Sequence, residues 1–425
     1  MTVEGGTVAV VGAGYPGKRR IYERMAALGA RLVILEETGH WSERLVGEGI
    51  ASKWVAVRVT GDPDVDAQAV LAALSAEGVR PDGILSFWEL SVPVVARAAA
   101  SLGLPGNPVE AVDAARSKLR MRQASEHAGL PTPRSRRVTS LDELYAAAAE
   151  LGFPSVVKPE FGSSAIGTVR VDSFESLPHI YWIVRESLEV PIHGLDFRAG
   201  NDLLLEDYLD GVEFDIDLVL EDGECVFSSV SQNWPTAEPS FQETGLHCPP
   251  DYGAKPVGQL VELATRTVQA FGFSQGVLHV EGKCTSSGPR LVEINPRLGG
   301  GRVHQIVETV WEVDLIEAEL RSALGLPQQL KPSRKPRCAV AHAIVYAPAT
   351  GRLSGLPFPE LTSDVGLGVI IDVAADVGEE VNGPDRTFAT ELAEIYVGAK
   401  NLRRARSLLA QVVRDPPVVE ASPTA

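Results

Sequence analysis

Cysteine is scarce in this chain, with four residues in 425 (Cys225, Cys248, Cys284 and Cys338) and no C-x-x-C spacing. This argues against a disulfide framework and a cysteine-based zinc site. Basic residues are also in deficit: 39 Lys and Arg face 56 Asp and Glu, for a formal net charge of −17. Such a surface is unsuited to nucleic acid or anionic lipid. No leader-like or membrane-length apolar segment is present, so we expect a cytoplasmic protein with neither nucleic-acid nor membrane partners.

The pattern of apolar residues predicts several domains. From residue 6 to about 107, short β-branched segments alternate with helix-period segments, which indicates βαβ units and a Rossmann-like parallel sheet. A helix is predicted over about 108–129, and from about 153 the chain is rich in strands, as in α+β proteins. The expected divisions are an α/β domain at 1–115, a central region at 116–330 (lobes 116–210 and 211–330), a small C-terminal subdomain at 338–415 and a loose tail at 416–425.

A glycine-rich turn follows the first predicted strand. Gly12–Gly17 matches G-x-G-x-x-G, and Glu36 and Glu37 stand about 20 residues further on, as in a dinucleotide-binding turn. The same segment also fits G-x-x-x-x-G-K, but Arg19 replaces the P-loop Ser or Thr and Pro16 removes a backbone N–H. Any tightly packed strand-to-helix turn favours glycine, and we favour that structural interpretation.

A lysine and a small-residue loop form the first candidate ligand site. Lys158 ends a β-branched strand and is followed by Gly162, Ser163 and Ser164 before the next strand. An ammonium group beside backbone N–H groups and hydroxyls suits a polyphosphate. The alternative is an ordinary hairpin turn, but ammonium groups are rarely placed at strand ends for packing alone.

An apolar strand ending in an acidic pair forms the second candidate. Glu206, Asp207, Tyr208 and Leu209 could offer backbone groups to an adenine edge, and Glu213 could take ribose hydroxyls. Acidic residues that alternate with apolar ones here could equally form the solvent face of a strand.

Two predicted strands carry the strongest signal. On adjacent antiparallel strands Glu281 and Glu293 would point the same way, and Asn295 shares the face of Glu293. Two carboxylates and an amide oxygen form a hard-cation site, suited to Mg²⁺ on nucleotide phosphates. Facing carboxylates without a cation would repel each other.

The segment after these strands adds cationic and backbone donors. Arg297 can neutralise phosphate or carboxylate charge, and Gly299, Gly300 and Gly301 leave N–H groups beside it. His279 could position the site or be a satisfied core histidine.

Together these segments resemble the ATP-grasp superfamily of carboxylate–amine ligases. Lys118, V-V-K-P at Lys158, the G-S-S loop, L-E-D-Y-L, H-V-E and E-I-N-P-R follow one another over about 116–302, in that family's order. The resemblance implies an ATP-grasp fold, phosphate contacts from Lys118 and Lys158, closure of the 162–167 loop over them, and adenine contacts from Glu206–Leu209. Ser117 departs from the family, where many relatives carry Asp.

Within the superfamily, E-I-N-P-R-L-G-G-G and Ala339–Leu353 look most like bacterial L-amino acid ligases of the bacilysin-synthesis type and carnosine synthases. This resemblance implies ATP and Mg²⁺ (or Mn²⁺), activation of an amino acid carboxylate as an acylphosphate, and coupling to an amine, with release of ADP and phosphate. Arg297 would be catalytic and assisted by Gly299–Gly301, while Glu243 would face the amine. We also expect a homodimer.

Two alternatives stay open at this stage. Biotin-carboxylase-like and formyl- or carboxy-transferring enzymes share the nucleotide motifs and would activate bicarbonate or formate instead. An NAD-binding dehydrogenase or nucleotide sensor would use the glycine-rich turn.

Overall fold

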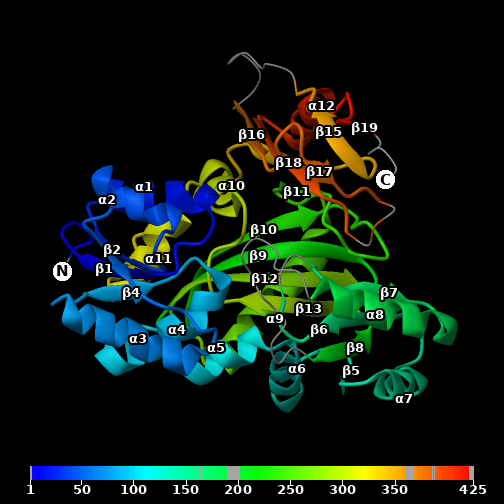
Figure 1. The fold of residues 1–425 in the computed structure, drawn as a ribbon, viewed down its shortest axis with the longest axis horizontal. Coiled ribbons are helices and arrows are strands. Elements are labelled where there is room, and N and C mark those ends of the chain that lie inside the picture. Colours follow the sequence, from blue (N-terminus) through cyan, green and yellow to red (C-terminus); the bar gives the residue numbers. More distant parts are fainter. Residues whose placement is uncertain are drawn as a thin grey trace.

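The computed structural model describes residues 2–162, 165–188, 202–358, 368–384, 386 and 388–420. An N-terminal α/β domain lies beside a central antiparallel sheet, a smaller lobe adjoins that sheet, and the C-terminal region adds further strands to one of its edges (Figure 1). In these ranges no helix is long and apolar enough to cross a membrane.

The N-terminal strands form a parallel sheet in the order β3-β2-β1-β4, which confirms the predicted βαβ organisation. Val8 and Val10 are buried on one face of β1, and Ala9 and Val11 on the other, as expected when helices cover both faces. The elements are β1 (Thr7–Val11), η1 (Pro16–Lys18), α1 (Arg19–Ala27), β2 (Arg31–Glu36), η2 (Trp41–Glu43), α2 (Arg44–Gly47), β3 (Lys53–Ala56), α3 (Pro63–Ala76), β4 (Gly83–Leu85), η3 (Glu89–Ser91), α4 (Val92–Leu102) and α5 (Val109–Arg116).

The glycine-rich turn after β1 is closed by neighbouring protein groups. Gly12 and Gly14 have positive φ angles of 71° and 66°. The Glu36 carboxylate accepts a hydrogen bond of 2.7 Å from the Ala13 amide, and the Tyr22 hydroxyl donates one of 2.7 Å to the Ala13 carbonyl. Because Glu36 caps the turn, this geometry supports the structural interpretation of the glycines.

The smaller lobe has a four-stranded antiparallel sheet in the order β5-β8-β6-β7, and α7 and α8 pack on it. The expected single helix over about 108–129 is wrong. The backbone is extended at Ser117, whose hydroxyl accepts a hydrogen bond from the Arg120 amide and so begins a new helix. The elements are α6 (Lys118–His127), β5 (Ser135–Val138), α7 (Leu141–Leu151), β6 (Ser155–Pro159), β7 (Val169–Val171), η4 (Phe174–Ser176), α8 (Leu177–Ser187) and β8 (Leu203–Asp207).

The central sheet has eight strands in the order β13-β12-β9-β10-β11-β14-β18-β16. It runs without a break from the second lobe into the C-terminal region, because β11 pairs with β14. Leucines of α9, among them Leu260 and Leu263, cover one face of the first strands. The elements of the second lobe are β9 (Val212–Glu221), β10 (Glu224–Asn233), β11 (Gly245–Cys248), α9 (Ala254–Ala270), β12 (Gly276–Thr285), β13 (Gly288–Asn295), α10 (Val303–Trp311) and α11 (Leu315–Ala323).

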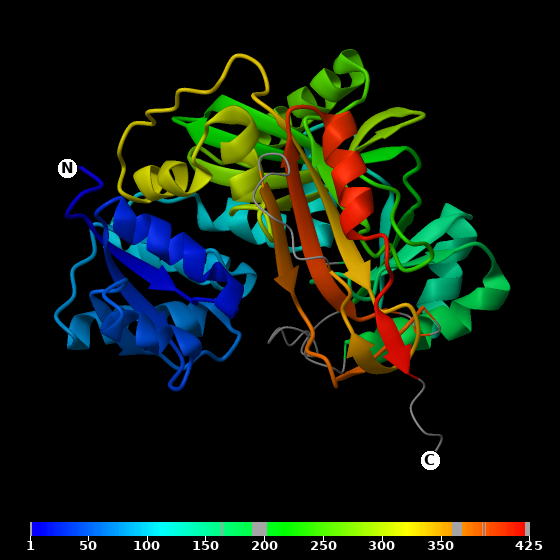
Figure 2. The same cartoon turned by 90° about the horizontal axis from the view of Figure 1, so that it is seen from above.

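In the C-terminal region, α12 packs on one face of β14 and β18. Figure 2 shows these strands between the N-terminal domain on one side and the smaller lobe on the other. The expected loose tail is wrong for Val418–Glu420, which form β19 and pair with β15. The elements are β14 (Ala339–Tyr346), β15 (Gly351–Gly355), β16 (Gly368–Val373), β17 (Glu380–Val381), β18 (Glu391–Ala399), α12 (Leu402–Val412) and β19 (Val418–Glu420).

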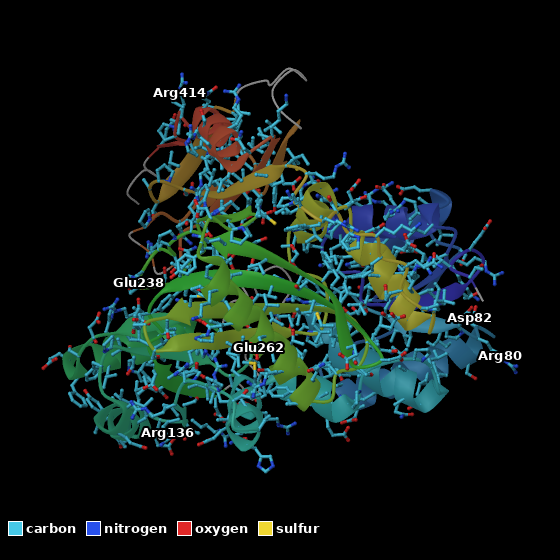
Figure 3. The ribbon with its side chains drawn as sticks, turned by 180° about the vertical axis from the view of Figure 1, so that it is seen from behind. Arg80, Asp82, Arg136, Glu238, Glu262 and Arg414 are labelled. Carbon is cyan, nitrogen blue, oxygen red and sulfur yellow. The ribbon has the colours of Figure 1, made fainter. Side chains whose placement is uncertain are left out.

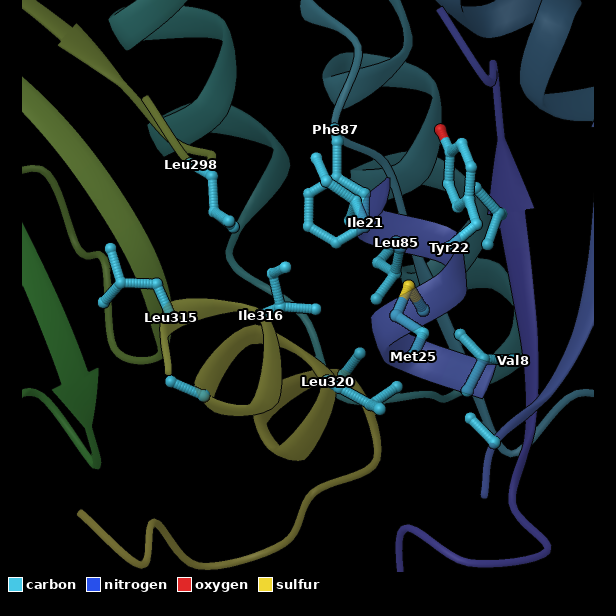
Figure 4. Packing of buried hydrophobic residues seen from close by; sticks show 14 of the residues in the cluster. Val8, Ile21, Tyr22, Met25, Leu85, Phe87, Leu298, Leu315, Ile316 and Leu320 are labelled. Atoms are coloured by element: carbon cyan, nitrogen blue, oxygen red, sulfur yellow. The ribbon is translucent and has the colours of Figure 1, made fainter. Parts of the chain in front are cut away.

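One hydrophobic core joins the N-terminal domain to the second lobe. Met25 and Phe87 from the first pack in the same cluster as Leu298, Ile316 and Leu320 from the second (Figure 4). The packing holds the glycine-rich turn next to the segment that follows β13.

Candidate active site

A cavity lies between the smaller lobe and the central sheet, and most of the predicted nucleotide and metal residues line it. Ser163 and Ser164 lie outside the described residues. His279, Asn295, Arg297 and the three glycines do not line this cavity; they lie on or after the strands that form its wall. The predicted residues on the wall are Lys118, Lys158, Gly162, Glu206, Asp207, Tyr208, Leu209, Glu213, Glu243, Glu281 and Glu293.

Glu206 is the centre of a buried charge cluster. Its carboxylate accepts hydrogen bonds from Nε and Nη2 of Arg122 at 3.0 and 3.1 Å and forms an ion pair with Lys158. Burial opposes the charge, but Arg122 and Lys158 lower the pKa of Glu206 to about 2. Burial lowers the pKa of Lys158 to about 8, against the effect of Glu206. The cluster leaves a surplus positive charge at the cavity wall, which suits phosphate.

Lys118 joins the smaller lobe to the second. Its Nζ lies 3.1 Å from Glu293 Oε1 and donates to the Gly162 carbonyl at 3.3 Å. Ser117, just before it, donates to the Glu160 carboxylate. Lys118 therefore lies between the carboxylates of the central sheet and the loop that begins at Gly162.

Glu281 lies opposite Glu293 on the antiparallel pair β12–β13, and His279 lies opposite Asn295. The Asn295 amide donates weakly to Glu281 at 3.5 Å. Burial and the adjacent Glu293 raise the pKa of Glu281. Two facing carboxylates and an amide oxygen are the donor set of a hard divalent cation, so these residues fit Mg²⁺.

His279 is held by a buried aspartate. Its Nδ1 lies 2.9 Å from Asp217 Oδ1, and Asp217 is fully buried. Burial opposes the charge, but the Asp217 hydrogen bond, with Asp215 and Glu281 nearby, raises the pKa of His279 to about 9. The imidazolium sits behind the Glu281 carboxylate, with Nε2 4.0 Å from Oε1, and offsets part of its charge.

Arg297 is anchored by a residue of the N-terminal domain. Its Nε donates to the Glu89 carboxylate, which also pairs with Arg116, and its Nη2 lies 3.5 Å from Asn295 Oδ1. Burial opposes the charge of Glu89, but Arg297 and Arg116 lower its pKa to about 2. Arg297 thus lies between the candidate metal residues and the N-terminal domain.

The glycines after Arg297 permit close packing. A Cβ at Gly299 would lie 2.8 Å from His279 Nδ1, and one at Gly301 would lie 2.7 Å from the Tyr396 hydroxyl, whereas Gly300 has open space. Gly301 also has a positive φ of 51°. At least two of the three glycines are therefore required by packing.

The predicted adenine segment is surrounded by additional contacts. Tyr208 donates to Glu238 at 2.7 Å, and the Arg170 guanidinium lies 4.6 Å from the Tyr208 ring centroid. Lys283 Nζ lies 3.3 Å from Glu213 and donates to the Leu209 carbonyl at 3.4 Å. Asp207 faces outward and pairs with Arg134 at 2.8 Å, so it contributes to the rim and not to the cavity floor.

A group of carboxylates lies on the other side of the site. Glu243 lines the cavity and, among the described residues, has no hydrogen bond or ion pair. Enclosure by protein, with Asp215 and Glu213 nearby, raises its pKa to about 8, although its side chain is open to the cavity. On β18, burial and Glu394 raise the pKa of Glu391 to about 7. These groups would attract a cation such as a substrate ammonium.

Sequence reasoning missed several residues of the site. Arg122 lies in the segment of Lys118 but receives no role from the sequence, Lys283 has no motif around it, and Glu89 and Glu391 are far from the recognised segments. One signal for Arg122 is available in the sequence. It stands four residues after Lys118 on α6, and this spacing places both side chains on one face of the helix.

Two protein families match the chain. The ATP-grasp domain matches residues 151–305, and the ATP-grasp N-terminal domain matches residues 22–106. The chain therefore contains an ATP-grasp N-terminal domain and an ATP-grasp domain, and its two lobes enclose a cavity lined by Lys118, Lys158, Glu281 and Glu293.

Two curated relatives and one solved structure show which ATP-grasp proteins the chain is similar to. Carnosine synthase 1 of Gallus gallus is 35% identical over 362 residues, covering 82% of this chain and 38% of the relative. Alanine–anticapsin ligase of Bacillus amyloliquefaciens is 28% identical over 253 residues, covering 56% of this chain and 52% of the relative. The chain thus spans about two fifths to one half of these relatives. The L-amino acid ligase of Bacillus licheniformis has the same fold, with a TM-score of 0.82, 19% identity, and coverage of 99% of this chain and 100% of that chain.

Proposed function

We propose that the protein is an ATP-dependent carboxylate–amine ligase that couples an amino acid carboxylate to the amine of a second amino acid. The observation that carries this proposal is the convergence of Glu281, Glu293, Lys118 and Lys158 on one cavity. Homology to carnosine synthase and alanine–anticapsin ligase supports ligation as the reaction. The same reaction class needs no nucleophilic side chain, because the substrate carboxylate itself attacks phosphorus.

Glu281, Glu293 and Asn295 would hold Mg²⁺, or Mn²⁺ in its place, and the cation would neutralise charge on the ATP phosphates. Lys118 and Lys158 bind the phosphates, and the Tyr208–Leu209 segment holds the adenine. A substrate carboxylate oxygen then attacks the γ-phosphorus, ADP leaves, and an acylphosphate forms. Positioning and charge neutralisation supply most of this acceleration.

In the second step the amine attacks the acyl carbon and phosphate leaves, which gives the amide or dipeptide. Arg297, fixed by Glu89, stabilises the oxygen of the tetrahedral intermediate, and the backbone of Gly299–Gly301 assists. The amine must lose a proton before it attacks. Glu243, whose pKa is raised to about 8, is suited to bind the ammonium and accept that proton.

ATP turnover with defined products tests the proposal. The purified chain is incubated with ATP, Mg²⁺ and amino acids, singly and in pairs, while ADP release is measured and products are weighed by mass spectrometry. We expect turnover that requires a pair and a product of mass equal to their sum minus water. Turnover with bicarbonate or formate alone would instead indicate a carboxylase or formyl-transfer enzyme.

Glu293→Gln is the matched variant for the metal residues, because it removes one of two facing carboxylates. We expect turnover to fall by roughly 100-fold or more, in line with the loss of a charged group at the reacting centre. Glu262→Gln is the control, since Glu262 is exposed on α9 (Figure 3). Equal activity in the two variants would contradict the assigned role of Glu293.

We also propose that the protein is cytoplasmic and assembles as a homodimer, as expected from the sequence. Light scattering of the purified protein tests the dimer, and a monomer at micromolar concentration would contradict it.

A further inference from the structure

Lys18 is a buried lysine that pairs with no carboxylate in the part of the chain that the structure describes. It ends the glycine-rich turn and is only 8% exposed. Among the described residues its ammonium group makes no hydrogen bond or ion pair. Its Nζ lies 5.3 Å from the Tyr15 ring centroid, and the two charges that act on it are those of Arg297 and Glu89. Lysine is rarely buried without a partner, so the position calls for an explanation.

The balance of charge around Lys18 is positive. The one nearby carboxylate, Glu89, is already engaged by Arg116 and Arg297. Three cations therefore face a single anion. Burial and Arg297 lower the pKa of Lys18 to about 7, against the effect of Glu89. A bound anion between Lys18 and Arg297 would balance the charge and remove this destabilisation.

The glycine-rich turn is built to hold this side chain. A Cβ at Gly14 would lie 2.9 Å from Lys18 Cδ, so glycine at that position lets the lysine lie across the turn. Gly14 and Tyr15 also line a cavity of about 930 Å³ at the carboxyl ends of the parallel strands. Substrate-sized space is thus present beside the turn, as is usual at this edge of an open α/β sheet.

We propose that Lys18, together with Arg297, binds the carboxylate group carried by the amine substrate. This inference rests on the proposed ligase function. The reacting carboxylate must lie near the γ-phosphate and the facing pair of glutamates, whereas Lys18 interacts with Arg297 and Glu89 on the N-terminal side. Tyr15, whose ring centroid lies 5.3 Å from Lys18 Nζ, is also close to two carboxylates: burial and the charges of Glu394 and Glu391 raise its pKa. A zwitterionic amine would therefore find cations and carboxylates on adjacent walls.

The test compares kcat/KM for two enzymes, each with two amine substrates. Wild type and Lys18→Met are compared with an amino acid that the ligase assay has identified as amine substrate, and with the amide of that amino acid, which lacks the carboxylate. We expect kcat/KM for the amino acid to fall roughly 10- to 100-fold in Lys18→Met, as for the loss of a charged hydrogen bond. The amide should change by less than about threefold, and Lys18→Arg should restore most of the loss.

Lys53→Met is the matched control, because Lys53 makes a surface ion pair with Glu77 and should leave both substrates unaffected. Equal losses for the amino acid and its amide would overturn the proposal and indicate a structural lysine. A selective rise in the KM of the acid substrate would overturn it in favour of the reacting carboxylate. Wild type that uses the amide as well as the amino acid would also overturn it. An absence of ATP turnover with every pair would instead defeat the ligase function itself.

Discussion

Replacement of Glu206 by glutamine separates two roles for this residue. If Glu206 contacts adenine, as the sequence predicts, Glu206→Gln should weaken ATP binding and leave the fold intact. In the structure, however, Glu206 is 3% exposed and compensates both Arg122 and Lys158. Glutamine keeps the shape but leaves two buried cations without an anion.

Two arguments give the size of the expected loss in stability. Removal of one partner of a buried ion pair costs about 3–5 kcal/mol. The pKa of Glu206 falls from 4.5 to about 2 on folding, a difference worth about 3 kcal/mol. For a folding unit of about 200 residues, such a loss lowers the melting temperature by roughly 10 °C.

Thermal unfolding measured at neutral pH tests the prediction, with Glu150→Gln as the control. Glu150 forms an exposed pair with Arg136, whose place at the surface is labelled in Figure 3, and its replacement should shift melting very little. The pKa of Glu206 is depressed, so its stabilisation is present above pH 4.5 and is lost as the pH falls towards 2. The difference between wild type and Glu206→Gln should therefore shrink below pH 4.5. A variant that melts within about 2 °C of wild type, with a raised KM for ATP, would refute the reasoning.

Three further predictions concern the residues around His279 and the glycine-rich turn. Asp217→Asn removes the carboxylate that keeps His279 charged, so NMR titration should place the His279 pKa at or below 6.5 instead of about 9; an unchanged value would refute the pairing. Gly299→Ala places a Cβ against His279 and should lower kcat/KM roughly 10- to 100-fold, while Gly300→Ala, which meets open space, should be near wild type; equal behaviour of the two would contradict the packing. Because Lys18 loses its proton above about pH 7, the KM of the amine substrate should rise above that pH in wild type and stay flat in Lys18→Arg, and parallel pH profiles would count against a role for the lysine.

Much of the candidate site could be predicted because its residues come from short segments with strong local rules. Strand alternation places Glu281 and Glu293 opposite each other once their strands pair, and the structure has that register. A lysine at the end of a strand, such as Lys158, is rare enough to indicate a ligand. The parallel N-terminal sheet followed from its βα alternation in the same way.

The remainder depends on contacts between distant parts of the chain. Glu89 and Arg297 are 208 residues apart, and no local pattern indicates that they pair. The sequence also cannot tell that Glu206, at the end of a strand, pairs with two buried cations, because Arg122 and Lys158 come from other segments. Ser117 interrupts the predicted helix because its hydroxyl caps a new one. A single side chain thus sets this boundary, and the pattern of apolar residues does not reveal it.

The proposed phosphate and amine sites differ in how their residues are brought together, so the amine specificity could change while the nucleotide chemistry stays the same. The proposed phosphate and metal residues lie in segments of the two lobes and are joined there by ion pairs, such as Lys118–Glu293 and Lys158–Glu206. The proposed amine site is instead assembled from Lys18 in the N-terminal domain, Glu243 before β11, and Glu391 on β18. None of these three residues forms an ion pair with Lys118 or Lys158 within the part of the chain that the structure describes. On this proposal, amine selectivity would depend on how the N-terminal domain is placed against the C-terminal strands of the central sheet, and the shared core around Phe87 and Ile316 holds the N-terminal domain in that place.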